Sequence, residues 1–514
     1  MRGLTLRMIE KAAGGTFHLS FLTEDGSFLS LSTEQLPHAA EKARAAFERA
    51  LDTEVASIVT DSRKAGPGSL FGAIAGARAD GHDFISAVFG QGAVCVFTER
   101  TLERADVFGQ DGAADGEGRA WIRVENTIAA LGRVAALYLE TLQIPVVGIT
   151  GSVGKTSTKE MIASVLSVRF RTRKTEGNFN NELGLPLTVF SLEPEDEVCV
   201  LEMGVSHFGD MTTLAAIARP QRMVITNIGT CHLEFLKDRE GVFRAKTEVF
   251  DYMKEGSRVF LNGNDDLLRK VDRVGGAAPV FFGVDSRTEG VSDLSAGPVI
   301  DYPADLPRAA CVTASSVRPL GFEGSACTIL TPAGELKVKV PVPGIHNCSN
   351  AAAAAAVGLS FGMSLDEIRE GIESAQTISG RFRIRKAGER TVIDDCYNAN
   401  PVSMKSSLLV LSGAEGKRCA ILGDMGELGE EEKLLHEKVG AYAASCVDRL
   451  VTIGPLSRCM YEAAKKENPK LPVSWYERVE DFLAHADAEI GPDDTILVKA
   501  SHYMKFERIV EALA

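Results

Sequence analysis

One segment of the chain has the residue types and the spacing of a phosphate-binding loop. The sequence GSVGKT at residues 151–156 follows a short β-branched run, residues 145–150, and opens a predicted helix at residues 156–168. Glycines let backbone N–H groups turn toward an anion, and the N-terminus of a helix adds a partial positive charge. We therefore expect Lys155 to reach the β and γ phosphates of a nucleotide, and the hydroxyl of Thr156 to hold Mg²⁺.

The loop departs from the general phosphate-loop pattern at one position. That pattern has a glycine six residues before the lysine, where this chain has Ile149. The shorter core GxxGKT is intact, and the strand, the lysine, the hydroxyls and the helix are in register. This combination disfavours the alternative of a chance glycine-rich turn before a helix. The residues of the loop predicted to contact the nucleotide are Gly151, Ser152, Gly154, Lys155, Thr156 and Ser157.

Three further side chains could bind a metal or act in catalysis. Glu202 ends an apolar strand at residues 198–202, where an ionised carboxylate is costly unless it meets a metal. The alternative is an ordinary acid at the end of a strand. His232 follows a strand and a glycine turn, and a lone histidine is more often structural than a ligand. Lys246 lies on a predicted helix, residues 241–253, where the residue pattern alone favours a solvated surface lysine.

Several polar side chains have both a binding and a local structural interpretation. Asn347 and Asn350 lie three residues apart at the start of an alanine-rich helix and share a face, where amides can bind adenine or cap the helix. Asn180 and Asn181 could contact a substrate or form Asx turns. Asp395 follows a predicted strand, where turn formation is the alternative to a ligand contact.

The elements that must position these residues alternate between strands and helices. The 514 residues suggest two to four domains. We place the domains at residues 1–125, 126–343 and 344–514, with residues 285–340 as a β-rich extension of the second. The alternation predicts an α/β fold with a doubly wound parallel sheet around the phosphate loop and a Rossmann-like C-terminal domain. Predicted strands lie at residues 120–124, 145–150, 198–202, 222–226, 392–395, 418–422, 449–453 and 495–499, and a predicted helix lies at residues 126–141.

The composition argues against several classes of protein. The formal net charge of −14 disfavours a nucleic-acid partner, whose binding face is normally basic. The ten cysteines contain no CxxC pair, which predicts reduced and mostly buried thiols in a cytosolic protein. Residues 1–15 lack an apolar signal core, and the most apolar stretch, residues 351–363, is shorter than the roughly 20 residues of a membrane span. We expect a soluble, cytoplasmic protein without stable membrane insertion.

The phosphate loop and the motifs around it resemble those of the Mur ligase family. The loop continues as GSVGKTSTK, and matches to this family follow in the same order along most of the chain. The matching segments are TDSRK (60–64), DGHDF (80–84), TEGNFNNELGLP (175–186), LEMG (201–204), TNIGTCHLE (226–234), AKTEVF (245–250), GIHNCSNAA (344–352), GR (380–381), DDCYNANP (394–401) and GDMGELG (423–429).

The resemblance implies an ATP-dependent ligase that forms an amide bond through an acyl-phosphate. It implies that Lys155, Glu202, His232 and Lys246 are catalytic, and that Thr156, Glu202, His232 and Lys246 hold Mg²⁺. It also implies that Lys246 is carbamylated by CO₂, which requires an uncharged amine and therefore a lowered pKa. Beyond the phosphate loop, the residues implied to contact ATP are Asn347, Asn350, Arg381 and Asp395.

The motifs are most similar to those of the member that adds D-alanyl-D-alanine to UDP-N-acetylmuramoyl-tripeptide in cytoplasmic peptidoglycan precursor synthesis. This implies that the first domain is a small α/β domain that binds the UDP-muramoyl substrate through Asp61, Ser62 and Arg63. Arg63 could equally be a surface charge. Asn180 and Asn181 are implied to bind the muramoyl-peptide side. We expect the protein to be a monomer.

Two alternatives compete with this interpretation. One is the neighbouring ligase that adds a diamino acid to UDP-muramoyl-dipeptide, whose Asp-Asn-Pro-Arg motif is absent from this sequence. The other is a nucleotide-binding regulator without catalysis, which the joint presence of Lys155, Glu202, His232 and Lys246 argues against.

The chain departs from the family in two places. Residues 499–502, Lys-Ala-Ser-His, lie where the family typically has Lys-Gly-Ser-Arg. Because Ala500 and His502 depart from that motif, we assign no dipeptide contact there. The segment between residues 15 and 55 is also longer than is usual in the family.

Overall fold

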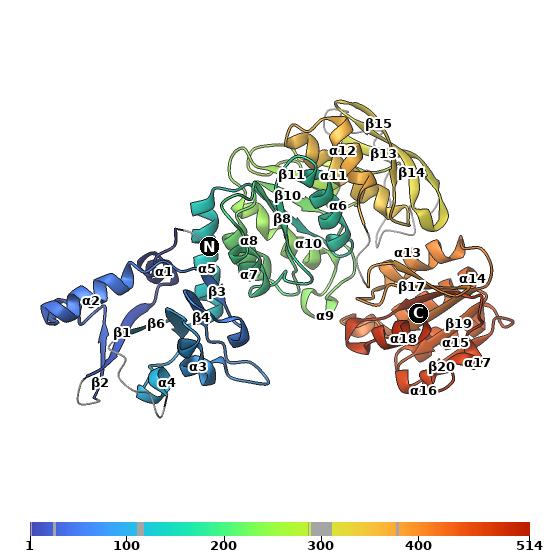
Figure 1. Cartoon of the computed structure of the whole chain (residues 1–514). Coiled ribbons are helices and arrows are strands. Elements are labelled where there is room, and N and C mark those ends of the chain that lie inside the picture. Colours follow the sequence, from blue (N-terminus) through green and yellow to red (C-terminus); the bar gives the residue numbers. More distant parts are fainter. Residues whose placement is uncertain (2, 24–26, 110–117, 286, 289–310, 377–379) are drawn as a thin grey trace. The chain divides into compact units, whose positions relative to one another are not determined.

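The computed structural model describes residues 1, 3–23, 27–109, 118–285, 287–288, 311–376 and 380–514. These residues form two compact units, which are described in turn. The first comprises residues 1–146, 173–203 and 213–219, and the second comprises residues 147–172, 204–212 and 220–514. Three β-sheets associated with helices confirm the predicted α/β class (Figure 1).

The first unit contains a six-stranded sheet in the order β2-β1-β6-β5-β4-β3. Strands β3 to β6 are parallel, whereas β1 pairs antiparallel with β2 and with β6. Its strands are β1 (Thr16–Leu22), β2 (Phe28–Ser32), β3 (Ser57–Val59), β4 (Ser69–Gly72), β5 (Cys95–Thr98) and β6 (Arg119–Arg123). Its helices are α1 (Leu6–Ala13), α2 (Glu41–Leu51), α3 (Ile85–Gly90), α4 (Arg104–Phe108) and α5 (Thr127–Leu142).

The long segment between residues 15 and 55 is an integral part of this sheet. It forms the β1–β2 hairpin and α2, and β1 continues the sheet by pairing with β6. The ring of Phe47 on α2 packs edge-on against Phe17 on β1, with centroids 4.9 Å apart, and both side chains are fully buried. The additional residues therefore extend both the sheet and the core.

The first unit also holds β8 (Thr172–Lys174) next to β9 (Val198–Glu202), with α7 (Gly184–Phe190) between them in sequence. Every residue of β9 is buried, as its apolar sequence predicts. Glu202 is the last residue of this strand.

The second unit holds the strand that leads into the phosphate loop. Its strands lie in the order β7, β10, β11, β12, β13, β14, β15; the first five are parallel and the last three form an antiparallel meander. The described part of the predicted β-rich extension, residues 311–340, is this meander. The strands are β7 (Val146–Thr150), β10 (Arg222–Ile225), β11 (Arg258–Asn262), β12 (Val280–Val284), β13 (Cys311–Pro319), β14 (Ser325–Thr331) and β15 (Gly334–Val340).

The alanine-rich sequence forms a buried helix beside the phosphate-loop helix. Helix α11 (His346–Ser360) packs against α6 (Lys155–Ser167) and against β11, β12 and β13. Its alanines at 351–356 are almost completely buried. Small side chains allow this helix to approach both neighbours closely. Helix α12 (Leu365–Glu373) packs against α6 and β15.

The C-terminal sheet has helices on both faces (Figure 1). Its order is β16-β17-β21-β18-β19-β20, and all pairs except β16–β17 are parallel. Leu497 packs with residues of α13 and α14 on one face, whereas Ile496 and Val498 pack with residues of α18 on the other. Burial on both faces explains the short apolar runs in the middle of these strands, such as Ile496 to Val498. The elements are β16 (Arg383–Ala387), β17 (Arg390–Asp394), β18 (Arg418–Gly423), β19 (Arg449–Ile453), β20 (Val473–Tyr476), β21 (Thr495–Lys499), α13 (Pro401–Ser412), α14 (Glu432–Cys446), α15 (Ser457–Glu467), α16 (Val479–Leu483), α17 (Ala486–Glu489) and α18 (Glu507–Leu513).

The predicted strands, and the predicted helices at 126–141 and 156–168, lie within two residues of their observed bounds. The prediction of one helix over residues 241–253 is wrong. Helix α10 (Arg239–Thr247) is followed by a tighter 3₁₀ helix, Glu248–Tyr252. The Glu248 carboxylate accepts hydrogen bonds from the backbone N–H groups of Gly209 and Thr212, which hold the chain off the α-helical path. The domain boundaries at 125 and 343 stay predictions.

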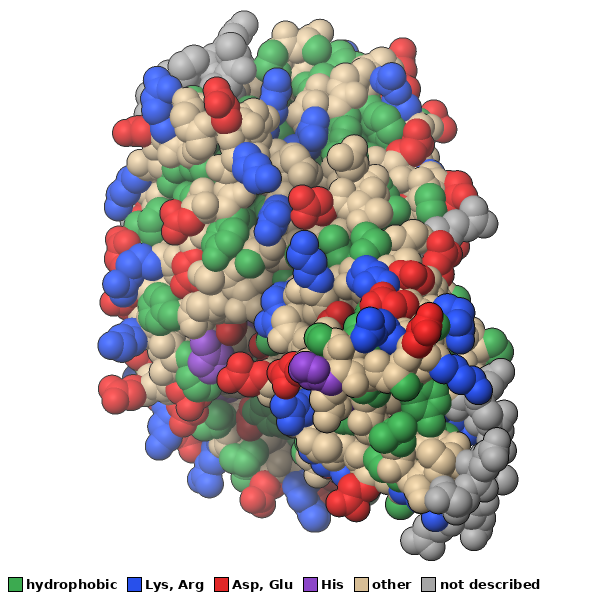
Figure 2. Space-filling view, turned by 90° about the vertical axis from the view of Figure 1, so that its left-hand side faces the viewer, with side chains coloured by type: hydrophobic (Ala, Val, Ile, Leu, Met, Phe, Trp, Pro, Cys, Tyr) green, Lys and Arg blue, Asp and Glu red, His purple; other side chains and the backbone are tan. Residues whose placement is uncertain are grey.

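The burial of the cysteines and the mixed charge of the surface are typical of a globular protein. Nine of the ten cysteines are buried and Cys459 is half-buried. Basic and acidic side chains are intermixed over the face drawn in Figure 2. In the described part of the chain, no helix combines the length and apolarity needed to cross a membrane.

Candidate active site

The phosphate loop passes from β7 into α6 through two glycines with positive φ. Gly151 has φ 148° and Gly154 has φ 84°. A Cβ atom at residue 151 would collide with the hydroxyl of Thr226, so no other residue fits there. Gly154 is the N-cap residue of α6, in the left-handed conformation that glycine tolerates. The first N–H groups of α6 are thereby available to an anion.

A second segment, residues 226–229, is hydrogen-bonded to the phosphate loop. The backbone N–H groups of Ser152 and Val153 donate to the carbonyl and side-chain oxygens of Asn227, at 3.1 and 2.9 Å. The Thr226 hydroxyl donates to the carbonyl oxygen of Val153 at 2.6 Å, and Gly229 N–H donates to the Ser152 hydroxyl at 2.8 Å. The loop conformation is therefore fixed before any ligand arrives.

Two cationic side chains stand at the loop. The ammonium of Lys155 donates to the carbonyl oxygen of Gly151 at 2.9 Å, so it is folded over the loop. The guanidinium of Arg381 donates to the Thr156 hydroxyl at 3.2 Å and lies 4.2 Å from the ring centroid of Tyr397. This placement of charge suits a polyphosphate.

A cavity in the second unit brings together nine of the ten residues predicted to contact ATP. The exception is Gly151, the first residue of the loop, which lies against Thr226. The nine are Ser152, Gly154, Lys155, Thr156, Ser157, Asn347, Asn350, Arg381 and Asp395.

Asn347 and Asn350 connect α11 to the phosphate-loop helix. The Thr158 hydroxyl donates to Asn350 Oδ1 at 2.9 Å, and Asn350 Nδ2 donates to Asn347 Oδ1 at 2.8 Å. Asn347 Nδ2 then donates to the Pro343 carbonyl oxygen at 2.8 Å. Helix α11 begins after Ile345 without a side-chain cap, so neither amide caps it. Both amides are held in place beside the cavity.

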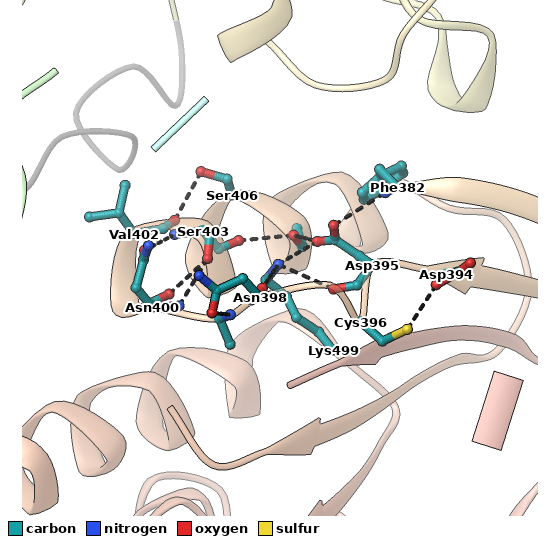
Figure 3. Close-up of polar contacts among 12 residues, drawn as sticks. Phe382, Asp394, Asp395, Cys396, Asn398, Asn400, Val402, Ser403, Ser406 and Lys499 are labelled. Carbon is teal, nitrogen blue, oxygen red and sulfur yellow. Dashed lines mark hydrogen bonds and ion pairs between the residues drawn. The ribbon is translucent and has the colours of Figure 1, made fainter. Parts of the chain in front are cut away.

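Asp395 is part of a buried ion pair. The ammonium of Lys499 lies 2.6 Å from Asp395 Oδ2 and also donates to the Asn398 carbonyl oxygen at 3.1 Å. The Ser407 hydroxyl donates to the same carboxylate oxygen, and Phe382 N–H donates to the other. Lys499 is 3% exposed and Asp395 is 8% exposed. Figure 3 shows the pair beside the loop that carries Asn398 and Asn400.

The sequence interpretation missed part of the cavity wall. Lys499, Asn262, Asn264 and Asp265 line it without having been assigned a role. Asp265 accepts from Ile228 N–H at 2.7 Å and from two backbone N–H groups of its own turn, and burial raises the pKa of its carboxyl. Two features of the sequence could have indicated these residues. The polar run NGNDD, residues 262–266, follows an apolar segment, and Lys499 ends the predicted strand at residues 495–499.

Glu202 retains an unused acceptor. In the first unit it is 2% exposed, and its Oε1 accepts from Asn180 Nδ2 at 2.8 Å. Its Oε2 is buried with no hydrogen-bond partner among the described residues. Asn181 Oδ1 instead accepts from Gly184 N–H at 2.8 Å, which is a local turn at the start of α7. An orphaned buried carboxylate oxygen fits a bound cation.

Lys246 and His232 both lie in the second unit. Lys246 is fully buried, its ammonium has no hydrogen-bond partner in the described chain, and burial lowers its pKa to about 8. The interpretation as a surface lysine is therefore wrong. His232 has φ 53°, and its Nδ1 lies 2.5 Å from Glu427 Oε2. That contact lacks hydrogen-bond geometry, but it lowers the pKa of Glu427.

The assignment of Thr156, Glu202, His232 and Lys246 as magnesium ligands stays a prediction. No three His, Cys, Asp or Glu side chains gather as a self-sufficient metal site in the described ranges. Mg²⁺ commonly takes one or two protein carboxylates together with waters and substrate phosphates. Taken singly, Thr156 in the second unit and the unpartnered oxygen of Glu202 in the first are each an oxygen donor of the kind that this ion prefers.

The residues predicted to bind uridine diphosphate lie in a short turn of the first unit. Asp61 precedes a 3₁₀ helix, Ser62–Lys64, and accepts from the N–H of Arg63. The guanidinium of Arg63 forms two hydrogen bonds, of 2.9 and 2.8 Å, with the Asp61 carboxylate, and its side chain is 87% exposed. Their substrate role stays a prediction.

Family models match the chain in three consecutive segments. They are described as "Mur ligase family, catalytic domain" at residues 54–139, "Mur ligase middle domain" at residues 149–358 and "Mur ligase, glutamate ligase domain" at residues 380–502. These segments contain the phosphate loop and the residues that line the cavity around it.

Individual proteins are similar over nearly the whole chain. The UDP-N-acetylmuramoyl-tripeptide–D-alanyl-D-alanine ligase of Bacillus subtilis (strain 168) is 35% identical over 90% of this chain and 93% of its own length. The Escherichia coli (strain K12) ligase of the same name is 33% identical over 90% and 94%. The crystal structure of MurF from Acinetobacter baumannii has a TM-score of 0.79 at 27% identity, over 99% of this chain and 98% of that one. MurF ligase from Thermotoga maritima in complex with ADP has a TM-score of 0.73 at 27% identity, over 90% and 97%.

The three-sheet α/β fold, the phosphate-loop cavity and these similarities define an ATP-dependent ligase that forms amide bonds. The chain belongs to the Mur ligase family.

The buried pair of Lys499 and Asp395 gives a prediction about stability. Replacing Lys499 by Met leaves a buried carboxylate without its cation, and we expect the free energy of unfolding to fall by about 3–5 kcal/mol. The double variant Lys499→Met with Asp395→Asn should recover most of that loss, because it removes both charges. Urea unfolding of the two variants measures the difference. Equal losses in the single and double variants would contradict the ion-pair interpretation.

Proposed function

We propose that the chain joins D-alanyl-D-alanine to UDP-N-acetylmuramoyl-tripeptide, with ATP converted to ADP and phosphate, in cytoplasmic peptidoglycan precursor synthesis. The observation that carries the proposal is the cavity in which Lys155 and Arg381 stand beside Thr156. The similarity to the ligases of B. subtilis and E. coli over 90% of the chain supports these particular substrates.

The chemistry requires activation of an acid, because a carboxylate does not accept an amine in water. A carboxylate oxygen of the tripeptide attacks the γ-phosphorus of ATP, the bond to ADP breaks, and an acyl-phosphate forms. The dipeptide amine then attacks the carbonyl carbon, loses a proton and displaces phosphate. Lys155, Arg381 and the N-terminus of α6 stabilise the negative charge on the transferring phosphoryl oxygens.

The ligands proposed for Mg²⁺ are Thr156, Glu202, His232 and Lys246, the last as a carbamate. When bound, the ion would neutralise phosphate oxygens and lower the charge that the attacking carboxylate meets. The unpartnered Oε2 of Glu202 supports its assignment. Asn180 holds the other oxygen of Glu202 and so fixes the orientation of this carboxylate.

The carbamate on Lys246 rests on the burial of its side chain. The neutral amine attacks CO₂, a nitrogen–carbon bond forms, and one proton leaves, so that a cation is replaced by a carboxylate. Burial lowers the pKa of the amine to about 8, which makes the neutral form accessible near physiological pH. A charged ammonium in the same position would be buried without a partner in the described chain.

The remaining roles follow the family. We assign the uridine-diphosphate site to Asp61, Ser62 and Arg63, and the muramoyl-peptide contacts to Asn180 and Asn181. Asn347, Asn350, Arg381 and Asp395 are assigned to ATP together with the phosphate loop. The protein acts as a monomer in this proposal.

The proposed function predicts a strict two-substrate requirement. Phosphate release from ATP should need both UDP-N-acetylmuramoyl-tripeptide and D-alanyl-D-alanine. Lys155→Met should lower kcat by about 10²–10³-fold, since it removes a donor to the transferring group. Lys466→Met on the exposed surface of α15 is the matched control and should leave kcat unchanged. Turnover with UDP-muramoyl-dipeptide and a diamino acid would instead support the neighbouring ligase, and no turnover at all would support the regulator.

The carbamate predicts a defined dependence on CO₂ and pH. With a pKa of about 8, the neutral amine falls about tenfold for each pH unit below 8, so carbamylation should become slower in the same proportion. Enzyme depleted of CO₂ at pH 6.5 should lose activity and regain it with bicarbonate at pH 8. Carbon-13 NMR with labelled bicarbonate should show a carbamate signal that Lys246→Arg abolishes. Full activity after depletion, without any such signal, would refute the carbamate.

A further inference from the structure

The loop that carries GDMGELG, residues 423–429, reaches the short helix that His232 begins. Glu427 Oε2 lies 2.5 Å from His232 Nδ1. At Gly429 of the same loop, a Cβ atom would lie 3.4 Å from the backbone nitrogen of Glu234 on α9 (Leu233–Leu236). The loop therefore contacts this helix at two points, and the first is a carboxylate beside an imidazole.

The backbone at Glu427 is strained. Its φ is 59°, in the left-handed region that costs a non-glycine residue about 1–2 kcal/mol. Glycines occupy positions 426 and 429 of the same loop, yet position 427 is glutamate. His232, the residue it faces, also has a positive φ, of 53°. Two strained residues whose side chains meet indicate that the side chains, and not the backbone, are required there.

The loop is held rigidly enough to place that carboxylate. Met425 N–H donates to His436 Nε2 at 3.0 Å, and Gly426 N–H donates to the Ser501 hydroxyl at 2.9 Å. Asp424 accepts from the N–H and the hydroxyl of Ser457 at 2.7 and 2.6 Å. The backbone before Glu427 is thus tied to three different segments of the C-terminal sheet and its helices.

We propose that Glu427 is a positioning residue for His232: a carboxylate oxygen 2.5 Å from Nδ1 would repel a lone pair on that nitrogen, so its charge favours the tautomer with the proton on Nδ1 and leaves the Nε2 lone pair available to a metal ion. This inference rests on the proposed magnesium site. A carboxylate or carbonyl beside the outer nitrogen commonly fixes the tautomer of a metal-binding histidine, and its loss weakens metal binding about 10–100-fold. Here the C-terminal domain would supply this group to a ligand of the central domain, so metal binding and domain docking would be coupled.

The test compares Glu427→Gln and Glu427→Gly with Glu430→Gln. Glu430 is exposed in the 3₁₀ helix, Gly429–Glu431, that directly follows the loop, and it is the matched control. The Mg²⁺ concentration for half-maximal rate should rise about tenfold or more in both Glu427 variants and stay unchanged in the control. Glu427→Gly should not lower the melting temperature, because glycine relieves the positive φ. A purely structural role would instead lower the melting temperature without altering the Mg²⁺ dependence.

Nitrogen-15 NMR of labelled imidazole, assigned with His232→Gln, provides a readout independent of activity. In the wild type, neutral His232 should carry its proton on Nδ1, and Glu427→Gln should shift the population toward Nε2. A wild-type proton on Nε2, or Glu427 variants with the Mg²⁺ dependence of the control, would overturn the proposal. Absence of Mg²⁺-dependent ligase activity in the wild type would refute the proposed function instead, while the NMR result would still report on Glu427.

Discussion

The close approach of the phosphate loop to the end of β10 is the constraint on which the site depends. Gly151 lies so near Thr226 that a side chain is excluded, and the segment 226–229 then fixes the loop through hydrogen bonds. The same segment is held by two further hydrogen bonds. Asp265 accepts one from Ile228 N–H, and Asn262 Nδ2 donates the other to the Thr226 carbonyl oxygen. Hydrogen bonds thus connect the ends of β7, β10 and β11. They fix the position of the phosphate loop and of the first turn of α6, whose N–H groups can bind an anion.

Some of the polar residues that line the cavity lie at the carboxyl ends of strands, among them Asn262, Asp395 and Lys499. Arg381, Asp395 and Lys499 come from the segment that surrounds the C-terminal sheet, whereas Lys155 and Thr156 come from the central one. Carboxyl ends of parallel strands are where open α/β sheets place their ligands. A ligand there would contact elements of both sheets, so that its binding energy can favour their association.

The sequence was sufficient for several central strands of the parallel sheets and for most of the cavity. Buried parallel strands such as β9, β19 and β21 each contain a run of at least two apolar residues, and the phosphate loop has a local signature, so both were predictable. Contacts between distant segments were not. The burial of Lys246, the pairing of Lys499 with Asp395 and the approach of Glu427 to His232 depend on tertiary packing, which no local pattern encodes. The predicted C-terminal end of α10 was wrong for the same reason. The Glu248 carboxylate accepts hydrogen bonds from the backbone of Gly209 and Thr212, which are distant in the sequence.

The transfer of a phosphoryl group onto a substrate carboxylate is the central claim, and isotope transfer tests it most directly. The terminal carboxylate of UDP-N-acetylmuramoyl-tripeptide would be labelled with oxygen-18 and the released phosphate analysed by mass spectrometry. An acyl-phosphate route predicts that each phosphate carries one oxygen from that carboxylate, because the carbon–oxygen bond breaks when the amine attacks. Amide formation with unlabelled phosphate, or with the label in AMP, would contradict the account.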